Sequence, residues 1–159
     1  MNASLKIAIA HDDLDTLVSL HASVCEIGHD VCVDAISGQQ LIESAGEQSP
    51  DLLIVKEELR DMRGWKAASD AWKGEPIPAI VLVDRSDGEL GNCPESTNVL
   101  AVLAEPVRQA DLVPAVPLVM QRFRQLQHLR KDINELTKEL ESGYRPISPT
   151  ENGASQLGL

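Results

Sequence analysis

The chain is poor in aromatic residues and in positive charge. Its 159 residues include two Trp, one Phe and one Tyr, so the core that its 43% hydrophobic residues can form must be aliphatic. Base stacking, which needs aromatic platforms, is poorly supported. The formal net charge of -11 also argues against nucleic-acid binding, because clustered Lys and Arg are needed to displace counterions.

The sequence also lacks the patterns of membrane, secreted and zinc-binding proteins. No apolar run approaches the roughly 20 residues of a membrane span, and the run at residues 5–10 is too short for a signal peptide. The cysteines form no CxxC pair; we expect Cys25 and Cys32 to be small buried hydrophobes and Cys93 to be a loop thiol. The four histidines show no metal-ligand spacing. We therefore predict a cytoplasmic protein without a metal or other cofactor.

Short apolar runs alternate with helical patterns along the chain, which is typical of βαβ units and a parallel sheet. Five strands are expected, at residues 6–10, 31–35, 52–55, 79–83 and 100–103. The third and fourth runs are continuously hydrophobic, which predicts helices on both faces of the sheet. Helical patterns occupy residues 13–27, 37–50 and 64–74, with Trp65, Ala68 and Trp72 expected on the core stripe of the last.

The fourth connection, residues 84–98, contains one leucine and several helix breakers, so no regular amphipathic helix is expected there. The helical pattern resumes after Pro106, with Asp111 as a cap and Pro114 in the first turn, where its missing N–H is harmless. Pro117 is expected to bend this helix or to delay its start.

Apolar residues then repeat at alternate spacings of three and four, as in the a and d positions of a coiled coil. The expected dimer seam consists of Val119, Leu126, Leu129, Ile133, Leu136 and Leu140. The alternative is a helix face folded back on the domain, but little sequence remains for a second layer, so we expect a homodimer. The flanking e and g positions carry no clear charge code and leave the orientation open. Residues 142–159 are rich in Gly, Pro and Ser, which predicts a disordered tail.

Four motifs in order, IAIAHDD, PDLLIVKEELRDMRGW, IPAIVLV and VLAVLAEPV, resemble the receiver domain of two-component response regulators. The resemblance covers residues 4–125. It implies a flavodoxin-like (βα)5 fold, a doubly wound parallel α/β sheet with strand order 2-1-3-4-5, and a site at the carboxyl ends of the strands. The expected organisation is a receiver-like domain at residues 4–118, a coiled-coil dimerisation helix at 119–141 and the tail at 142–159.

Receivers move a phosphoryl group from a histidine kinase to an aspartate, and the remaining site residues neutralise charge with Mg²⁺ and an ammonium group. The matching positions here are His11 and Asp12 for the acidic pair, Lys56 for the phosphoacceptor, Val83 for the Thr or Ser, Glu105 for the lysine and Val102 for the aromatic switch. Only Asp12 keeps its role. The resemblance therefore implies a degenerate phosphorylation pocket with no enzymatic activity.

The replacements exchange the charges of the pocket: a receiver sets an aspartate against a lysine, and Lys56 and Glu105 occupy these two positions with the signs reversed. We hypothesise that Lys56 pairs with Glu105, Asp12 or both, so that a fixed ammonium fills the volume of Mg²⁺. The alternative is an unused pocket that has drifted, with Lys56 extending into water. A relocated phosphoacceptor at Asp13 or Glu57 is a further alternative, although strand alternation points a neighbouring side chain away from the pocket.

The function expected from these residues is a phosphorylation-independent protein-interaction module in bacterial two-component signal transduction, with a signalling protein as its partner. One alternative is a truncated or degenerate transcription antitermination regulator. The segment RFRQLQHLRKDINELTKEL resembles the connecting helix of those RNA-binding proteins, but the sequence that follows is not the basic RNA-binding domain they carry. Binding of nucleic acid or of a membrane by this chain is not expected.

Overall fold

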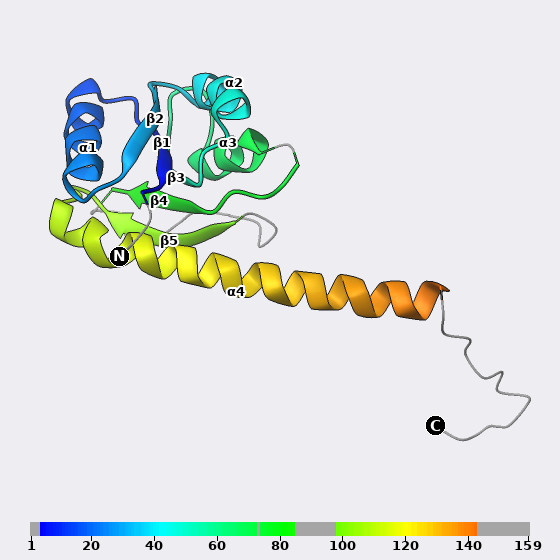
Figure 1. Ribbon diagram of the computed structural model, residues 1–159. Coiled ribbons are helices and arrows are strands. Elements are labelled where there is room, and N and C mark those ends of the chain that lie inside the picture. Colours follow the sequence, from blue (N-terminus) through cyan, green and yellow to red (C-terminus); the bar gives the residue numbers. More distant parts are fainter. Residues whose placement is uncertain (1–3, 73, 85–97, 143–159) are drawn as a thin grey trace, which may run out of the picture. The chain divides into compact units, whose positions relative to one another are not determined.

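The computed structural model describes residues 4–72, 74–84 and 98–142, and it contains one parallel β-sheet with helices on both sides (Figure 1). The strands are β1 (Lys6–Ala10), β2 (Asp30–Ala35), β3 (Leu52–Lys56), β4 (Ala79–Val83) and β5 (Val99–Ala104). They are hydrogen-bonded in the order β2-β1-β3-β4-β5, and all four neighbouring pairs are parallel. The expected flavodoxin-like α/β fold is therefore confirmed.

Four helices lie in the described residues: α1 (Leu14–Glu26), α2 (Gly38–Gln48), α3 (Gly64–Ala71) and α4 (Gln109–Ser142). The chain divides into two compact units, Met1–Phe123 and Arg124–Leu159, and the boundary falls inside α4. None of the helices in the described part of the chain is long and apolar enough to cross a membrane. The predictions made for residues 85–97, which include Cys93, and for 143–159 lie outside the described residues.

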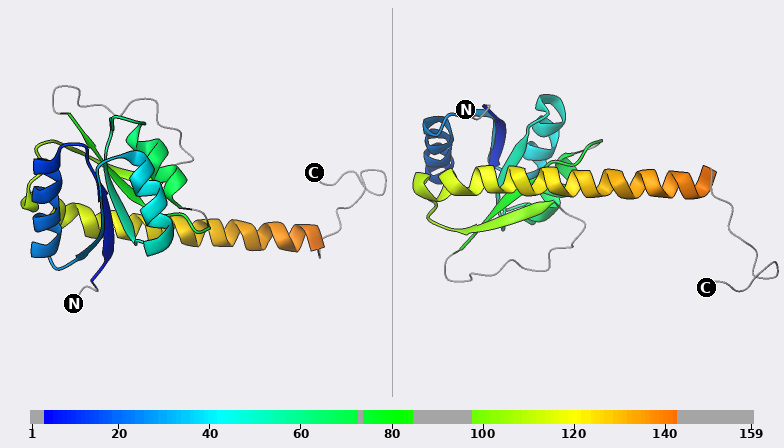
Figure 2. Two further views of the ribbon diagram at one scale, coloured as in Figure 1. Left: turned by 90° about the horizontal axis from the view of Figure 1, so that it is seen from above. Right: turned by 60° about the horizontal axis from the view of Figure 1, so that its bottom comes forward.

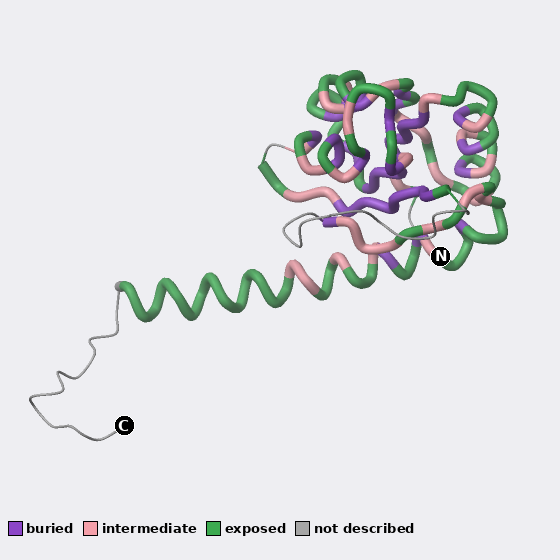
Figure 3. The backbone as a smooth tube through the Cα atoms, turned by 180° about the vertical axis from the view of Figure 1, so that it is seen from behind, coloured by how far each residue is buried: buried purple, intermediate pink, exposed green. Residues whose placement is uncertain are grey.

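Each face of the sheet is covered by its own helices, as Figure 2 shows for α1 on one side and α2 and α3 on the other. Alternate side chains of β1 separate the two faces: Ile7 and Ile9 pack with α1 and the first part of α4, whereas Ala8 and Ala10 pack with α2 and α3. Buried residues accordingly concentrate in the strands (Figure 3). Full burial of β4 follows from this double cover, as its continuous hydrophobicity predicts.

The buried stripe of α3 differs from the expected one. Its buried residues are Gly64, Ala67, Ala68 and Ala71. The helix ends at Ala71, and Trp65 and Trp72 are only half-buried. Small residues are required because α3 starts very close to β3: a Cβ added to Gly64 would lie 2.0 Å from the carbonyl oxygen of Lys56. Trp65 follows Gly64 on the helix and Trp72 follows its last residue, so neither lies on the buried stripe.

The start of α4 also differs from the expectation. The helix begins at Gln109, and the carboxylate of Asp111, already inside the first turn, accepts a hydrogen bond from the backbone N–H of Arg108 at 2.9 Å. Pro114 and Pro117 both lie beyond the first turn, so neither sets the start of the helix. Both prolines are exposed, and each removes one intrahelical hydrogen bond because it lacks a backbone N–H.

Val119, which was expected in the dimer seam, instead belongs to the core of the first unit. It is fully buried in one cluster with Leu112 and Val116 of α4 and with residues of α1, β1 and β3. Residues 112, 116 and 119 follow the spacing of a single helix face, and that face packs on the sheet. The compact unit extends to Phe123, beyond the expected boundary at residue 118.

The cysteines are less buried than expected. Cys25 is exposed and Cys32 is half-buried, so the prediction of a buried side chain is wrong for Cys25. The reason is helical rotation: Val24 is fully buried on α1, and the next residue points about 100° away from it. Burial raises the pKa of the Cys32 thiol above its ordinary value.

Candidate functional site: the degenerate phosphorylation pocket

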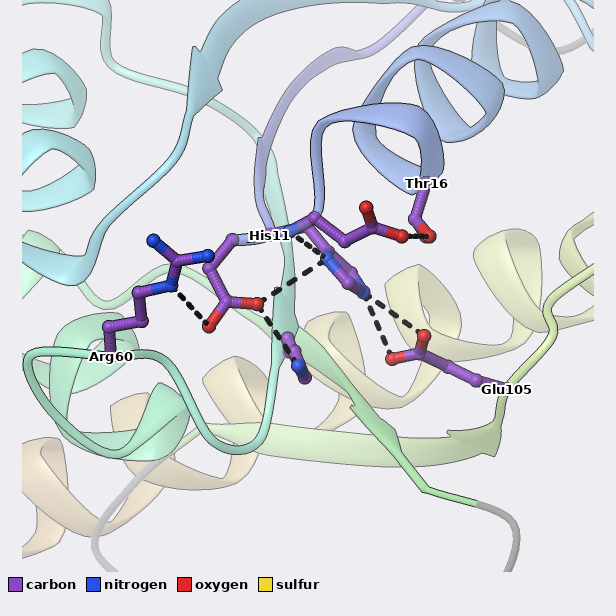
Figure 4. A network of polar contacts seen from close by, with 7 residues as sticks. His11, Thr16, Arg60 and Glu105 are labelled. Carbon is purple, nitrogen blue, oxygen red and sulfur yellow. Dashed lines mark hydrogen bonds and ion pairs between the residues drawn. The ribbon is translucent and has the colours of Figure 1, made fainter.

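The predicted site residues come from the ends of neighbouring strands. His11 and Asp12 follow β1, Lys56 ends β3 and Glu105 follows β5. Because parallel strands end at the same edge of a sheet, these side chains converge there, as Figure 4 shows for the network around His11 and Glu105. The structure thus brings these four residues together at the carboxyl edge of the sheet.

Asp12 is held by two cationic side chains. The ammonium nitrogen Nζ of Lys56 lies 3.0 Å from Oδ1 of Asp12, and Nε of Arg60 lies 4.0 Å from the other oxygen, Oδ2. The Asp12 side chain is 13% exposed and that of Lys56 is 31% exposed, so the Lys56–Asp12 ion pair is partly shielded from water. The structure therefore shows the Lys56–Asp12 pair, which is one of the pairings considered for Lys56.

His11 joins the start of α1 to the segment after β5. Its ring is 2% exposed, and Nδ1 accepts the backbone N–H of Asp13 at 3.0 Å. The ring proton is consequently on Nε2, which donates to both carboxylate oxygens of Glu105, at 3.1 and 3.0 Å. Sequence reasoning identified both positions but not their pairing; the signal was the joint replacement of an acid by His11 and of a lysine by Glu105.

Val83 and Val102 take no side-chain part in this network. Val83 ends β4, is 2% exposed and carries no group that can hydrogen-bond a phosphoryl oxygen. It acts through its backbone, because its carbonyl oxygen accepts the N–H of Glu105 at 2.8 Å. Val102, at the expected switch position of β5, is 41% exposed. Neither side chain supplies the polar or aromatic group that its position has in receivers.

The two carboxylates considered as relocated phosphoacceptors face other groups. Oδ2 of Asp13 accepts a 2.6 Å hydrogen bond from the hydroxyl of Thr16, and this bond lowers the pKa of Asp13. Glu57 is 5% exposed, and its Oε2 lies 3.9 Å from Nη1 of Arg63. Glu57 directly follows Lys56, and successive side chains of a strand point to opposite faces. The contact of Glu57 with Arg63 is consistent with a side chain that points away from Lys56.

A further carboxylate, Asp61, fixes the loop after β3. Its two oxygens accept the backbone N–H groups of Gly38 and Gln39, each at 2.9 Å, at the start of α2. These hydrogen bonds lower the pKa of Asp61, as expected for a carboxylate at a helix N-terminus. Sequence reasoning missed this contact, because nothing local in the sequence links residue 61 to residues 38 and 39.

An open pocket of about 460 Å³ adjoins the network. Thr16 and Ser19 of α1 line it together with Lys56, Glu105 and Val107. Its walls therefore carry hydroxyl groups and charges of both signs, and Lys56 and Glu105 are accessible from it.

The residues at this edge do not fit Mg²⁺. A magnesium site of a receiver needs carboxylate oxygens. The first position of the acidic pair is here His11, and the carboxylate at the second position, Asp12, is hydrogen-bonded to the ammonium of Lys56. Within residues 4–72, 74–84 and 98–142, no group of three or more His, Cys, Asp or Glu side chains is arranged to hold a metal ion. The pocket therefore lacks the donor set for the phosphoryl-transfer chemistry of receivers.

No family model matches the chain. It is 28% identical over 137 residues to the transcriptional regulatory protein PdtaR of Mycobacterium tuberculosis, and the aligned region covers 86% of this chain and 67% of PdtaR.

Solved structures of receiver domains are similar to most of the chain. The receiver (REC) domain of AraT, a response regulator from Geobacillus stearothermophilus, has a TM-score of 0.67 and 22% identity and covers 79% of this chain and 99% of that domain. The receiver domain of a modulated diguanylate cyclase from Desulfovibrio desulfuricans has a TM-score of 0.69 and 20% identity, with coverages of 77% and 98%. With its strand order and its converging site positions, the chain has the fold of the receiver domain of response regulators.

Proposed function

We propose that this chain is a phosphorylation-independent, receiver-like module that binds a signalling protein in bacterial two-component signal transduction. The observation that carries the proposal is Lys56 at the phosphoacceptor position, with its ammonium 3.0 Å from Asp12. A lysine side chain cannot form the acyl phosphate of a receiver. Here the lysine also forms an ion pair with Asp12, the acid that would hold Mg²⁺ in a receiver.

The pair of His11 with Glu105 supports the same proposal. Together with the Lys56–Asp12 pair, it ties the carboxyl ends of β1, β3 and β5 through hydrogen-bonded side chains at the positions that a receiver uses for switching. Partly buried pairs of this kind specify one arrangement more than they add stability. The module would therefore present one surface to its partner and act by binding, without enzymatic activity.

Self-association is part of the proposal. Large apolar side chains in the second half of α4 remain exposed, and they follow the spacing of a coiled coil. We propose that a homodimer covers them and that the dimer presents two copies of the binding module.

Incubation of the chain with acetyl phosphate and Mg²⁺ tests the proposal. Intact mass reports a phosphoryl adduct, light scattering reports the oligomeric state, and a receiver domain that keeps its aspartate serves as the positive control. We expect no added mass and a constant dimer. The variants Asp13→Asn and Glu57→Gln complete the design: an adduct that disappears in one of them would identify a relocated phosphoacceptor and overturn the proposal.

Transcription regulation is a second candidate, favoured by the similarity to PdtaR, a transcriptional regulatory protein. In that case the receiver-like fold would control an activity on nucleic acid. With a net charge of -11, this chain is expected to show no binding to RNA or DNA at physiological salt. Saturable, salt-dependent binding measured by fluorescence anisotropy would favour the second candidate over the first.

A further inference from the structure

The second half of α4 carries an apolar stripe that the described residues leave largely exposed. Its members with exposures of 56 to 60% are Leu129, Ile133, Leu136 and Leu140. Figure 3 shows this part of the helix as exposed along its length. In proteins most of the stability of a helix comes from the packing of its apolar face, so an exposed stripe of this kind points to a packing partner.

We propose that the partner is a second copy of this chain, joined in a parallel, two-stranded coiled coil. The inference rests on the self-association included in the proposed function. Leu126, Ile133 and Leu140 occupy a positions, and Leu129 and Leu136 occupy d positions, in unbroken alternation of three and four residues. An identical helix supplies knobs and holes of the same spacing and length, which makes a second copy the matching partner.

The charges beside the stripe oppose an antiparallel pair. In that orientation g positions face g positions and e positions face e positions across the interface. With the apolar layers matched at the centre of the stripe, Asp132 would face Asp132 of the other copy and Arg130 would face Arg130. Shifting by one heptad would place Asp132 opposite Glu139, so two acids still meet. Both antiparallel registers therefore set like charges against each other.

A parallel pair avoids these contacts. There each g position faces the e position five residues later in the other helix. Gln125 then lies opposite Arg130, and Asp132 lies opposite Thr137, so that no like charges meet. Repulsion between like charges therefore disfavours the antiparallel orientation and leaves the parallel one. The flanking positions contain no attractive ion pair, so the preference comes from this repulsion alone.

The residues of the stripe also favour two strands over three or four. Ile133, the β-branched residue of the stripe, is at an a position, and both d positions are Leu; this distribution suits the side-chain geometry of a parallel dimer. A dimer with this geometry joins two receiver-like units in one particle. A partner with two matching sites would then bind with an avidity that a single unit lacks.

Disulfide trapping tests the orientation in the full chain. In a background with Cys25→Ser, Cys32→Ala and Cys93→Ser, we expect Leu126→Cys alone and Leu140→Cys alone each to form a covalent dimer under mild oxidation. A parallel pair places each of these positions beside its own copy. Cross-linking that requires a mixture of Leu126→Cys and Leu136→Cys chains, and fails for each variant alone, would show an antiparallel pair and overturn the proposal.

The variants Ile133→Lys and Asn134→Lys test the interface itself. They introduce the same side chain at neighbouring positions, one on the stripe and one beside it. We expect Ile133→Lys to be monomeric by light scattering and Asn134→Lys to remain a dimer, while circular dichroism shows both chains folded. A dimeric Ile133→Lys variant, or a mass of three or four chains for the unmodified protein, would overturn the two-stranded pair.

Failure of this inference and failure of the proposed function give different results. A phosphoryl adduct on a parallel dimer would overturn phosphorylation independence and leave the coiled coil in place. A monomer that takes up no phosphoryl group would overturn the coiled coil and the self-association, and it would leave phosphorylation independence in place.

Discussion

At the scale of the residue, we expect the local stability of the pocket to depend on the ion pair of Lys56 with Asp12. We expect Lys56→Ala to lower the free energy of unfolding by about 1–2 kcal/mol, between the values for exposed and buried ion pairs. The reason is that Asp12, whose side chain is only 13% exposed, would lose the ammonium group 3.0 Å away. Urea unfolding followed by circular dichroism measures the change.

Lys66→Ala is the matched control for that variant. Lys66 makes an ion pair of the same length, 3.0 Å, with Asp70, but on an exposed face of α3 and four residues away in the same helix. Its loss should cost about 0.5 kcal/mol or less. If both variants lost the same stability, Lys56 would be a surface lysine with no special part in the pocket.

Asp61 gives stability a predictable pH dependence. Its pKa is lowered in the folded protein by the N–H groups of Gly38 and Gln39. A carboxyl group of this kind stabilises the fold above its unfolded pKa, and the contribution is lost as pH falls through the lower, folded pKa. We expect the urea midpoint of Asp61→Asn to be lower than that of the unmodified protein at pH 7. The gap between the two midpoints should narrow below about pH 4. A constant gap from pH 7 to pH 3 would contradict this.

At the scale of the element, the start of α3 depends on the absence of a side chain at Gly64. We expect Gly64→Ala to lower the free energy of unfolding by about 3 kcal/mol, because the new Cβ would meet the backbone carbonyl of Lys56, which cannot move aside as a side chain can. Gly46→Ala is the control within α2: nothing lies within 4 Å of its added Cβ, so stability should rise by up to about 1 kcal/mol. Thermal unfolding of the two variants compares them, and a loss for both would contradict the steric argument.

The two halves of α4 illustrate how one helical pattern serves two environments. Val119 and Leu126 are seven residues apart and look equivalent in the sequence, yet Val119 is fully buried in the sheet-packing face. Periodicity reports that a residue lies on an apolar stripe, but it does not say which surface covers that stripe. The expected seam was therefore one residue too long at its start.

At the scale of the whole molecule, the residues that differ from those of a receiver pocket, His11, Lys56, Val83 and Glu105, are spread over four strand ends. We expect Lys56→Asp alone to accept no phosphoryl group from acetyl phosphate, because it adds a carboxylate near Asp12 and Glu105 and removes the ammonium. The combined variant His11→Asp, Lys56→Asp, Val83→Thr and Glu105→Lys restores every replaced group of the pocket, and it should gain the mass of one phosphoryl group in the presence of Mg²⁺. A folded combined variant without that adduct would show that a further change in the chain disables the pocket.

The sequence by itself determined the fold class, the strand order and the identity of the pocket residues. Five apolar runs, the first four of them separated by helical patterns, predict the fold class. The strand order and the pocket positions are what the resemblance to the receiver domain implies, and the motifs at the ends of the first, third, fourth and fifth runs carry that resemblance. The replacement of the phosphoacceptor by Lys56 is visible in the same way, because the surrounding motif stays intact.

Only the tertiary structure decided which pocket residues pair with each other. Lys56 lies 3.0 Å from Asp12, His11 bonds Glu105, and Asp61 bonds the start of α2. These contacts join residues that are between 22 and 94 positions apart. Charge alone allowed several pairings, and the choice among them depends on the directions in which neighbouring strands end, which the packing of the sheet and its helices sets.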